Sequence, residues 1–476
     1  MYPSQIRRLP SGETKEILSV GLACSECFHG PRLAKLLQPG FVYEQKVMEQ
    51  LMAGEMADPL SIHTSSGVPP ALEEFIDALT PYLPWENVHE LDWCVSLQIE
   101  GASAVWAAID MLLQELILTT GDKNRTKVAV GATSYHGPPS TSFGAKSPLW
   151  CKTHQLKYPV PTPFCDKSHD ELLAEYQGFL NEHGSEIGVI VFEPQWGSSQ
   201  AALPWPRELL SSYTKMAKAR GIRVLCDEIM CGLGRHGKGT LFISEAWSLD
   251  PDAVTFGKAI GGGVYPLSGA IIKKGRDILQ TNKCSVMQSH TYAGSSTRSL
   301  MTATEVLKEM KNWFPIIAKN GQEMAHIFSY LASISEGMIT AQGQGLMWGC
   351  MFSHEGQNKE EQYRLKAFAT FKKVCEDVGV LPYFVPVGGF MVTPMVDVDV
   401  GTIYEIGIKL EEAIRKTRKE MEWKEISSEG ETIKAEASTV LPVLATKCST
   451  NLHATKTCTS CNSFVCNSIR NRFMQV

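Results

Sequence analysis

The sequence predicts an α/β protein: a large domain with a mostly parallel central sheet, followed by a smaller α+β domain. The first observation is an alternation of patterns, in which "EIGVIVFEP", "PRELLSSYTKMAKARG" and "IRVLCDE" have the periodicities of a strand, a helix and a strand. A helix that connects two buried strands is the connection that a parallel sheet requires. The second observation is that helical patterns near residues 302–319, 359–376 and 404–420 surround one extended stretch, "VLPYFVPVGGFMVTPMV", as in a small α+β domain.

Four segments are predicted along the chain. Residues 1–60 are expected to be irregular, with one helical stretch near Tyr43–Met56. Residues 61–305 form the large domain and residues 306–424 the small one. Residues 425–476 have no periodicity and are rich in serine, threonine, lysine and cysteine, so we expect a disordered tail.

The composition is that of an ordinary globular protein. The 476 residues are 43% hydrophobic and 20% charged, and the formal net charge is -6. This balance gives no reason to expect nucleic acid or an anionic membrane as a partner. The sequence has no apolar run long enough for a membrane span and no apolar core of a secretory signal near its start.

The fourteen cysteines are scattered along the chain. Without a secretory signal we expect reduced thiols and a cytoplasmic location. Cys24 and Cys27 form one CxxC pair and Cys458 and Cys461 another, at opposite ends of the chain. A four-thiolate zinc site would require both pairs to meet, so chance spacing is favoured and no metal is expected.

A lysine and an aspartate follow two of the predicted strands. Lys258 lies between the strand "AVTF" and a run of three glycines, and Asp227 ends the strand "IRVLCD". A buried lysine is costly unless it is paired, neutral or covalently engaged. If Lys258 holds a pyridoxal ring covalently, Asp227 gains a partner in the protonated ring nitrogen. Taken alone, each residue favours the simpler interpretation, in which Asp227 caps a helix and Lys258 pairs with it as an ordinary ion pair.

Three further segments add candidate ligand contacts. Gly101 and Ala102 open a predicted helix whose free amides and dipole would suit a phosphate, although an ordinary helix start is the simpler interpretation. Tyr135 and His136 follow the strand "KVAVG" and could stack on a flat ring or lie in a surface loop. Thr291, in "SHTYAGSS", could donate its hydroxyl to a phosphate.

Together these motifs resemble the class III aminotransferases, of the fold-type-I pyridoxal-phosphate-dependent enzymes. The resemblance covers about residues 67–420 and is strongest across "EPQWG", "VLCDEIMCGLGRHG", "PDAVTFGKAIGGGVYPLSGAI" and "SHTYAGSS". It implies that Lys258 is the internal-aldimine lysine, that Asp227 pairs with the pyridine nitrogen and that Glu193 is an active-site glutamate.

The resemblance also implies pyridoxal 5'-phosphate as cofactor and a homodimer with active sites at the interface. Gly101 and Ala102 would hold the phosphate through their amides, and Tyr135 or His136 would cover the ring face. Thr291 would reach the phosphate of the neighbouring subunit.

Several residues depart from the family pattern. Phe390 stands where an arginine often binds a substrate carboxylate, and Ser198 replaces the glutamate that often pairs with that arginine. Trp196 and Met230 stand at positions where glutamines commonly approach the cofactor, and Glu100 replaces a serine or threonine beside the phosphate. These departures predict a retained cofactor site with a remodelled, more apolar substrate pocket.

The sequence therefore predicts an aminotransferase that moves an amino group from an amine or amino acid to a carbonyl acceptor, in a ping-pong reaction through Lys258. An aminomutase, a racemase, a decarboxylase or a non-catalytic relative of the same fold would share Lys258 and Asp227. A nicotinamide oxidoreductase is a further alternative, because Gly232, Gly234 and Gly237 fit GxGxxG. That motif neither follows a strand directly nor opens a long helix, so its context is poor.

Overall fold

The computed structural model describes residues 4–8, 14–19, 53, 70–85, 93–137, 155–163, 166–262, 265–273, 296–352, 360–386 and 388–423. Apart from Ala53, the helical stretch predicted near Tyr43–Met56 lies outside these residues. The tail predicted at residues 425–476 also lies outside them.

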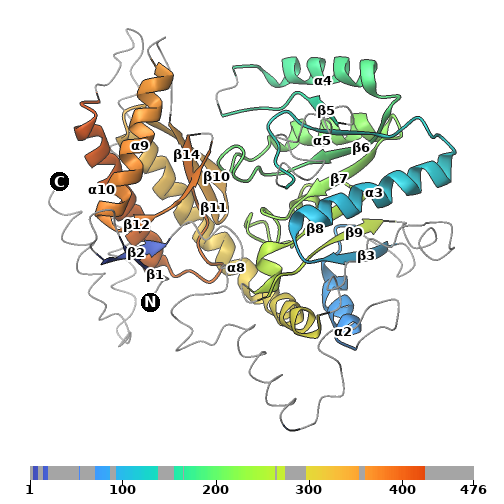
Figure 1. The fold of residues 1–476 in the computed structure, drawn as a ribbon, viewed down its shortest axis with the longest axis horizontal. Coiled ribbons are helices and arrows are strands. Elements are labelled where there is room, and N and C mark those ends of the chain that lie inside the picture. The colour runs from blue at the N-terminus through green and yellow to red at the C-terminus, as the bar shows by residue number, and fades with distance from the viewer. Residues whose placement is uncertain are drawn as a thin grey trace.

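The centre of the fold is a seven-stranded sheet of order β3-β9-β8-β7-β6-β4-β5 (Figure 1). Its strands are β3 (Trp93–Gln98), β4 (Lys127–Gly131), β5 (Gln155–Tyr158), β6 (Ile187–Phe192), β7 (Arg223–Asp227), β8 (Ala253–Phe256) and β9 (Ser268–Lys273). The five strands from β8 to β5 run parallel to their neighbours, whereas β9 is antiparallel to both β8 and β3. The predicted mostly parallel sheet is confirmed.

Helices cover both faces of this sheet because alternate side chains of each buried strand point to opposite sides. The covering helices are α3 (Gly101–Thr120), α4 (His169–His183) and α5 (Arg207–Lys218). In β6, Val189 and Val191 belong to the apolar cluster that α3 shares. Ile190 and Phe192 belong to the cluster that includes residues of α4 and α5.

Helix α3 is long and apolar enough to cross a membrane by length and composition. Half of its most apolar window is buried inside the fold, where it packs on β8 and β9. A buried core helix of a globular domain meets the same criteria, so this helix is explained by its packing on the sheet.

A second, antiparallel sheet of order β10-β11-β14-β13 forms the other lobe of the molecule (Figure 1). Its strands are β10 (Ile339–Gln344), β11 (Met347–Phe352), β13 (Tyr383–Val385) and β14 (Gly389–Val392), with α9 (Glu360–Val378) and α10 (Val400–Glu420) beside them. Helix α8 (Thr297–Ile334) runs between the two lobes, with α2 (Pro70–Leu79) packed on it. The predicted boundary at residues 305 and 306 falls within α8. The predicted α+β character of this lobe agrees with these elements.

The prediction that residues 1–60 are irregular is wrong for two short segments. Strand β1 (Ser4–Arg8) pairs in antiparallel fashion with β2 (Thr14–Ser19). Strand β2 also pairs in parallel fashion with β12 (Val380–Leu381), so the chain's start joins the C-terminal lobe. The pairing partner lies far along the chain, which local periodicity cannot reveal.

Candidate active site

A cavity of about 740 Å³ opens where the parallel strands of the large sheet end. Its lining comes from the segment after β4, the residues that follow β6 and β8, the end of β7 and the residues after it, the start of α3, and the first residue of β13 together with Pro386. The carboxyl ends of parallel strands are where open α/β sheets bind their ligands. Tyr383 and Pro386 close the cavity from the smaller sheet, so both lobes contribute to it.

The cavity brings together every predicted site residue that the structure describes. These lining residues are Gly101, Ala102, Tyr135, His136, Glu193, Asp227, Met230 and Lys258. Thr291 lies outside the described residues, so its role stays a prediction.

Lys258 has an unusual backbone conformation. Strand β8 ends at Phe256, Gly257 continues in an extended conformation, and Lys258 begins a short 3-10 helix, Lys258–Gly261, with φ of 53°. Positive φ is uncommon for a residue other than glycine and costs free energy. The surrounding fold therefore holds this half-buried lysine in one place at the cavity wall.

Asp227 is buried and accepts hydrogen bonds with both carboxylate oxygens. Nδ1 of His136 lies 2.7 Å from Oδ2, and Oδ1 accepts from the amide of Ile229 at 3.2 Å and from Oγ1 of Thr255 at 3.1 Å. Burial works to lower the pKa of His136, but the hydrogen bond and charge of Asp227, helped by Glu193, outweigh burial and raise it. The raised pKa favours the protonated form of His136 beside Asp227.

Glu193 comes directly after β6 and faces the same group of side chains. Its Oε2 accepts a hydrogen bond from the amide of Tyr135 at 3.3 Å. Burial raises the pKa of Glu193 to about 7, against the opposing charges of His136 and Lys258. Near neutral pH this carboxyl group can therefore either hold or release a proton.

The start of α3 packs closely against Ile229 and leaves its first amides without a side-chain cap. Its N-terminal flanking residue, Glu100, makes no side-chain cap to the first amides of the helix. A Cβ at Gly101 would lie 2.7 Å from Cδ1 of Ile229, so no larger residue fits there without a shift. Gly101 and Ala102 both line the cavity, which places unpaired amides of a helix start at its wall.

Several buried polar atoms of the cavity residues have no hydrogen-bond partner within the described parts of the chain. They are Oγ1 of Thr133, Oγ of Ser134, Nε2 of His136, Oε1 of Gln195 and Oγ of Ser199. Buried polar atoms are usually paired, and unpaired ones call for a ligand, an ion or water. Their concentration around one cavity is that of a binding site for a polar ligand.

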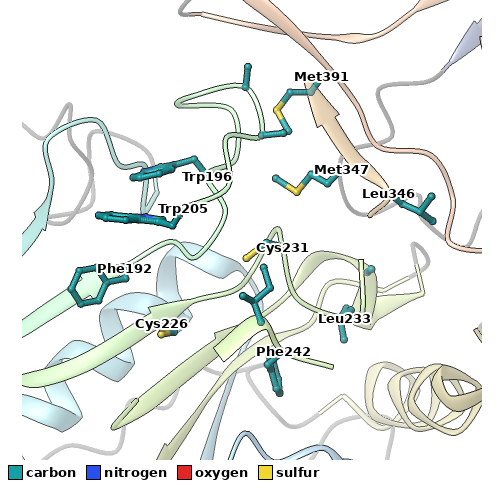
Figure 2. Packing of buried hydrophobic residues seen from close by; sticks show 14 of the residues in the cluster. Phe192, Trp196, Trp205, Cys226, Cys231, Leu233, Phe242, Leu346, Met347 and Met391 are labelled. Atoms are coloured by element: carbon teal, nitrogen blue, oxygen red, sulfur yellow. The ribbon is translucent and has the colours of Figure 1, made fainter. Parts of the chain in front are cut away.

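Two of the residues that depart from the family pattern do not line the cavity. Phe390 is fully buried in β14 and stacks on Phe371, with ring centroids 4.8 Å apart. Trp196 is buried and stacks on Trp205 at 4.8 Å, as Figure 2 shows. The sequence-based expectation that such residues make the pocket more apolar is therefore not met by these two side chains. Ser198, Met230 and Glu100 do line the cavity.

The GxGxxG motif serves the packing between the two lobes. Gly234 and Gly237 have φ of 71° and 74°, and a Cβ at Gly237 would lie 3.4 Å from Cα of Gly345. The buried side chain of Arg235 donates through one nitrogen to the carbonyls of Leu346 and Pro394. The helix that follows, α6 (Ile243–Ala246), has only four residues, so the motif lacks the helix of a dinucleotide site.

The pairing of His136 with Asp227 was missed by sequence reasoning, which placed His136 or Tyr135 over a ring face. The signal was present, because both residues follow strands of one parallel sheet, but the strand order was not known. Tyr135 is half exposed at the cavity. The contributions of Tyr383 and Pro386 were also missed, because they depend on how the two lobes face each other.

The chain matches the family model described as Aminotransferase class-III over residues 62–393. It is 29% identical over 187 residues to the adenosylmethionine-8-amino-7-oxononanoate aminotransferase of Nitratidesulfovibrio vulgaris, which covers 36% of this chain and 34% of that protein. It is 27% identical over 290 residues to the 4-aminobutyrate aminotransferase GabT of Escherichia coli, and this match covers 54% of this chain and 65% of that protein. In these two comparisons the match spans about a third and about two thirds of the relative's length.

Solved structures show the same fold. The omega-transferase of Vibrio fluvialis JS17 superposes with a TM-score of 0.72 at 15% identity, over 89% of this chain and 98% of that one. The omega-aminotransferase of Paracoccus denitrificans superposes with a TM-score of 0.71 at 16% identity, over 88% of this chain and 94% of that one. The predicted fold-type-I architecture is confirmed. With the family model matched over most of its length, the chain belongs to the class III aminotransferase family.

Proposed function

We propose that this chain is a pyridoxal-phosphate-dependent aminotransferase, which moves an amino group from a small-molecule amine to a carbonyl acceptor. The observation that carries the proposal is the meeting of Lys258, Asp227 and Glu193 in one cavity at the ends of adjacent parallel strands. Family membership is the second support.

The cavity fits the cofactor that the family implies. Its unpaired buried polar atoms would be satisfied by a polar ligand, and Gly101 and Ala102 at the start of α3 line its wall. The amides of Gly101 and Ala102 would hold the phosphate, Asp227 the ring nitrogen and Lys258 the aldehyde carbon. When bound, pyridoxal phosphate supplies an electron sink for the negative charge that develops at the amine-bearing carbon of the substrate.

Lys258 and Asp227 would do different work in the reaction. As a neutral amine, Nζ of Lys258 can take a proton from the amine-bearing carbon of the donor. In the second half of the reaction it can deliver a proton to the carbonyl carbon of the acceptor. The positive φ of Lys258 fixes the point from which its side chain reaches into the cavity. Asp227 stays in place because His136, Ile229 and Thr255 all donate to it. His136 is thus a positioning residue.

Glu193 would buffer the charge of the site. Its pKa of about 7 lets it lose or regain a proton as positive charge forms or disappears beside it. The carboxylic acid lies between the amide of Tyr135 and the pair formed by His136 and Asp227. We assign Glu193 this electrostatic role.

We propose further that the protein works as a homodimer in the cytoplasm. Ile99, Trp106 and Leu118 are large apolar side chains of 37%, 38% and 45% exposure on or beside α3, the helix that opens at the cavity. Such side chains on one helix suit burial against a second copy of the chain. Free thiols at the described cysteines, such as Cys226 and Cys350, agree with a reducing compartment.

A transfer assay tests the proposed function. The protein with pyridoxal phosphate, a panel of primary amines and a keto acid is expected to yield both the carbonyl product and the new amino acid in equal amounts, detected by mass spectrometry. Lys258→Ala should abolish both products. Loss of carbon dioxide, an amine that is only rearranged, or a product without transfer to the keto acid would instead identify one of the alternative reactions of this fold.

A further inference from the structure

The residue that precedes α3 carries a charge opposite to what an anion site requires. Glu100 lines the cavity next to Gly101 and Ala102, the two residues whose amides would hold the cofactor phosphate. Its backbone is extended, with φ of -134° and ψ of 157°, and its side chain makes no cap to the helix amides. The side chain of Glu100 is exposed.

Glu100 also occupies a donor that a phosphate could use. Oγ of Ser103, in the first turn of α3, donates to Oε1 of Glu100 at 3.2 Å. A hydroxyl in the first turn of a helix is well placed to donate to an anion bound at that helix start. In this chain the Ser103 hydroxyl is engaged by the carboxylate instead.

Buried polar atoms without partners lie elsewhere in the cavity, as a ligand site would require. Nε2 of His136, Oγ of Ser134 and Oε1 of Gln195 are buried and unpaired within the described parts of the chain. Each belongs to a residue that is at least nine-tenths buried and that lines the same cavity as Glu100. The anion site at α3 is therefore one end of a larger ligand site.

We propose that Glu100 lowers the affinity of this chain for the cofactor phosphate and competes with the phosphate for the Ser103 hydroxyl. The carboxylate repels the phosphate and holds the Ser103 hydroxyl, so both effects weaken phosphate binding at the start of α3. This inference rests on the proposed function, since it concerns the same cofactor. The effect should be specific to the phosphate, because Glu100 lies beside the residues that would hold the phosphate, whereas Asp227 and Lys258 would contact the ring.

The size of the effect follows from the charges. A carboxylate and a phosphate with close to two negative charges, a few ångströms apart at a partly exposed site, repel each other enough to weaken binding about tenfold. Salt screens this repulsion at such an exposed site. The favourable attraction of the helix start is screened by the same salt, so removal of Glu100 should make the affinity fall more steeply with ionic strength.

The test is a set of dissociation constants for pyridoxal phosphate and for pyridoxal, measured by quenching of tryptophan fluorescence in the full chain. Glu100→Gln removes the charge, and is expected to tighten pyridoxal phosphate about tenfold while leaving pyridoxal unchanged. Glu74→Gln is the matched control, because Glu74 is an exposed glutamate on α2 that does not line the cavity. It should change neither constant.

A double-mutant cycle tests the competition for Ser103. Ser103→Ala should have little effect in the native chain, because Glu100 already holds the hydroxyl. In a Glu100→Ala background the same change should weaken pyridoxal phosphate several-fold, because the freed hydroxyl would then bind the phosphate. Equal effects in both backgrounds would overturn the competition.

The outcomes separate this inference from the proposed function. If the native chain binds pyridoxal phosphate and Glu100→Gln behaves like Glu74→Gln, the inference is wrong and the function stands. If only Glu100→Gln binds pyridoxal phosphate, the inference is supported in its strongest form. If neither protein binds pyridoxal phosphate, both the inference and the proposed function are contradicted.

Discussion

Nδ1 of His136 lies 2.7 Å from Oδ2 of Asp227, and both side chains are buried at the floor of the cavity. The contact joins the loop after β4 to the end of β7, two strands that are separated by β6 in the sheet. A buried carboxylate without such a donor would be strongly destabilised. The pair therefore fixes the position of the carboxylate that would face the cofactor ring.

Replacement of His136 by phenylalanine keeps a ring in this position and removes the donor. The free energy of unfolding is expected to fall by about 1–3 kcal/mol, because Asp227 loses a partner in a buried setting. Since the pKa of His136 is raised in the folded chain, this loss should be largest below about pH 6.5 and should shrink as the pH rises through the folded value. Urea denaturation at several pH values measures both effects.

The matched control is His183→Phe. His183 forms a similar contact with Glu186, at 3.0 Å between Nδ1 and Oε1, but both side chains are partly exposed. Its loss should cost about 0–1 kcal/mol. An equal cost at both histidines would contradict the buried ion pair at the cavity floor.

Glu228 should make the protein less stable as the pH rises from about 4.5 to 7. Burial raises the pKa of Glu228 to about 7, against the hydrogen bonds that it accepts from the Ser244 and Ile243 amides. The folded chain therefore binds more protons than the unfolded chain in this window, which costs up to about 3 kcal/mol on ionisation. The free energy of unfolding, measured from pH 4.5 to 8, should decline accordingly.

Glu228→Gln should flatten that decline, because glutamine does not ionise. The variant is expected to be less stable at acid pH, since glutamine offers one acceptor oxygen to the two amides. The slope with pH is thus the relevant quantity. Glu208→Gln, at an exposed position on α5, should leave the slope unchanged. An unaltered slope in Glu228→Gln would show that Glu228 is not the group that titrates.

Replacement of Gly349 and replacement of Gly178 by alanine should change the free energy of unfolding in opposite directions. A Cβ at Gly349 of β11 would lie 2.2 Å from the carbonyl oxygen of Ala201, so Gly349→Ala must push the two lobes apart. A cost of about 1–3 kcal/mol is expected. At Gly178, inside α4, an added Cβ meets nothing within 4 Å, and Gly178→Ala should stabilise by about 0.5–1 kcal/mol. Thermal denaturation of the two variants measures both signs, and a stabilised Gly349→Ala would contradict the contact between the lobes.

Replacement of Phe390 should mainly lower stability, whereas replacement of Tyr383 should mainly change substrate binding. Phe390 packs on Phe371 in the core, so Phe390→Ala should lower the free energy of unfolding by about 3–5 kcal/mol and leave KM for the amine little changed. Tyr383 lines the cavity from the neighbouring strand and is 40% exposed, so Tyr383→Ala should alter KM with only a small loss of stability. The opposite pattern would mean that Phe390 faces the substrate.

Most of the large lobe could be predicted from the sequence. The runs that became β6 and β7 are apolar, short and joined by the amphipathic helix α5, so their parallel direction follows from the connection. Between β7 and β8 the structure has only the four-residue helix α6. Because Asp227 ends one strand of such a sheet and Lys258 follows another, their place at the same edge of the sheet was predictable, whereas the adjacency of the two strands was not.

Other features were not predictable because they depend on contacts between distant segments. Strand β2 joins the C-terminal lobe through β12, which lies some 360 residues further along the chain. In β14 every residue is buried, so alternation of polar and apolar residues cannot tell which side chain faces the cavity. Phe390 was placed in the pocket because an arginine often binds a substrate carboxylate at that position in the family, whereas its ring packs on Phe371 in the core.

The most direct test of the account is the visible absorption spectrum of the purified protein with added pyridoxal phosphate, before and after borohydride. We expect a band that borohydride removes, that is present in a control variant of the exposed Lys215, Lys215→Ala, and that is absent in Lys258→Ala. No band, or a band of equal strength in Lys258→Ala, would contradict the assignment of Lys258 as the residue that holds the cofactor.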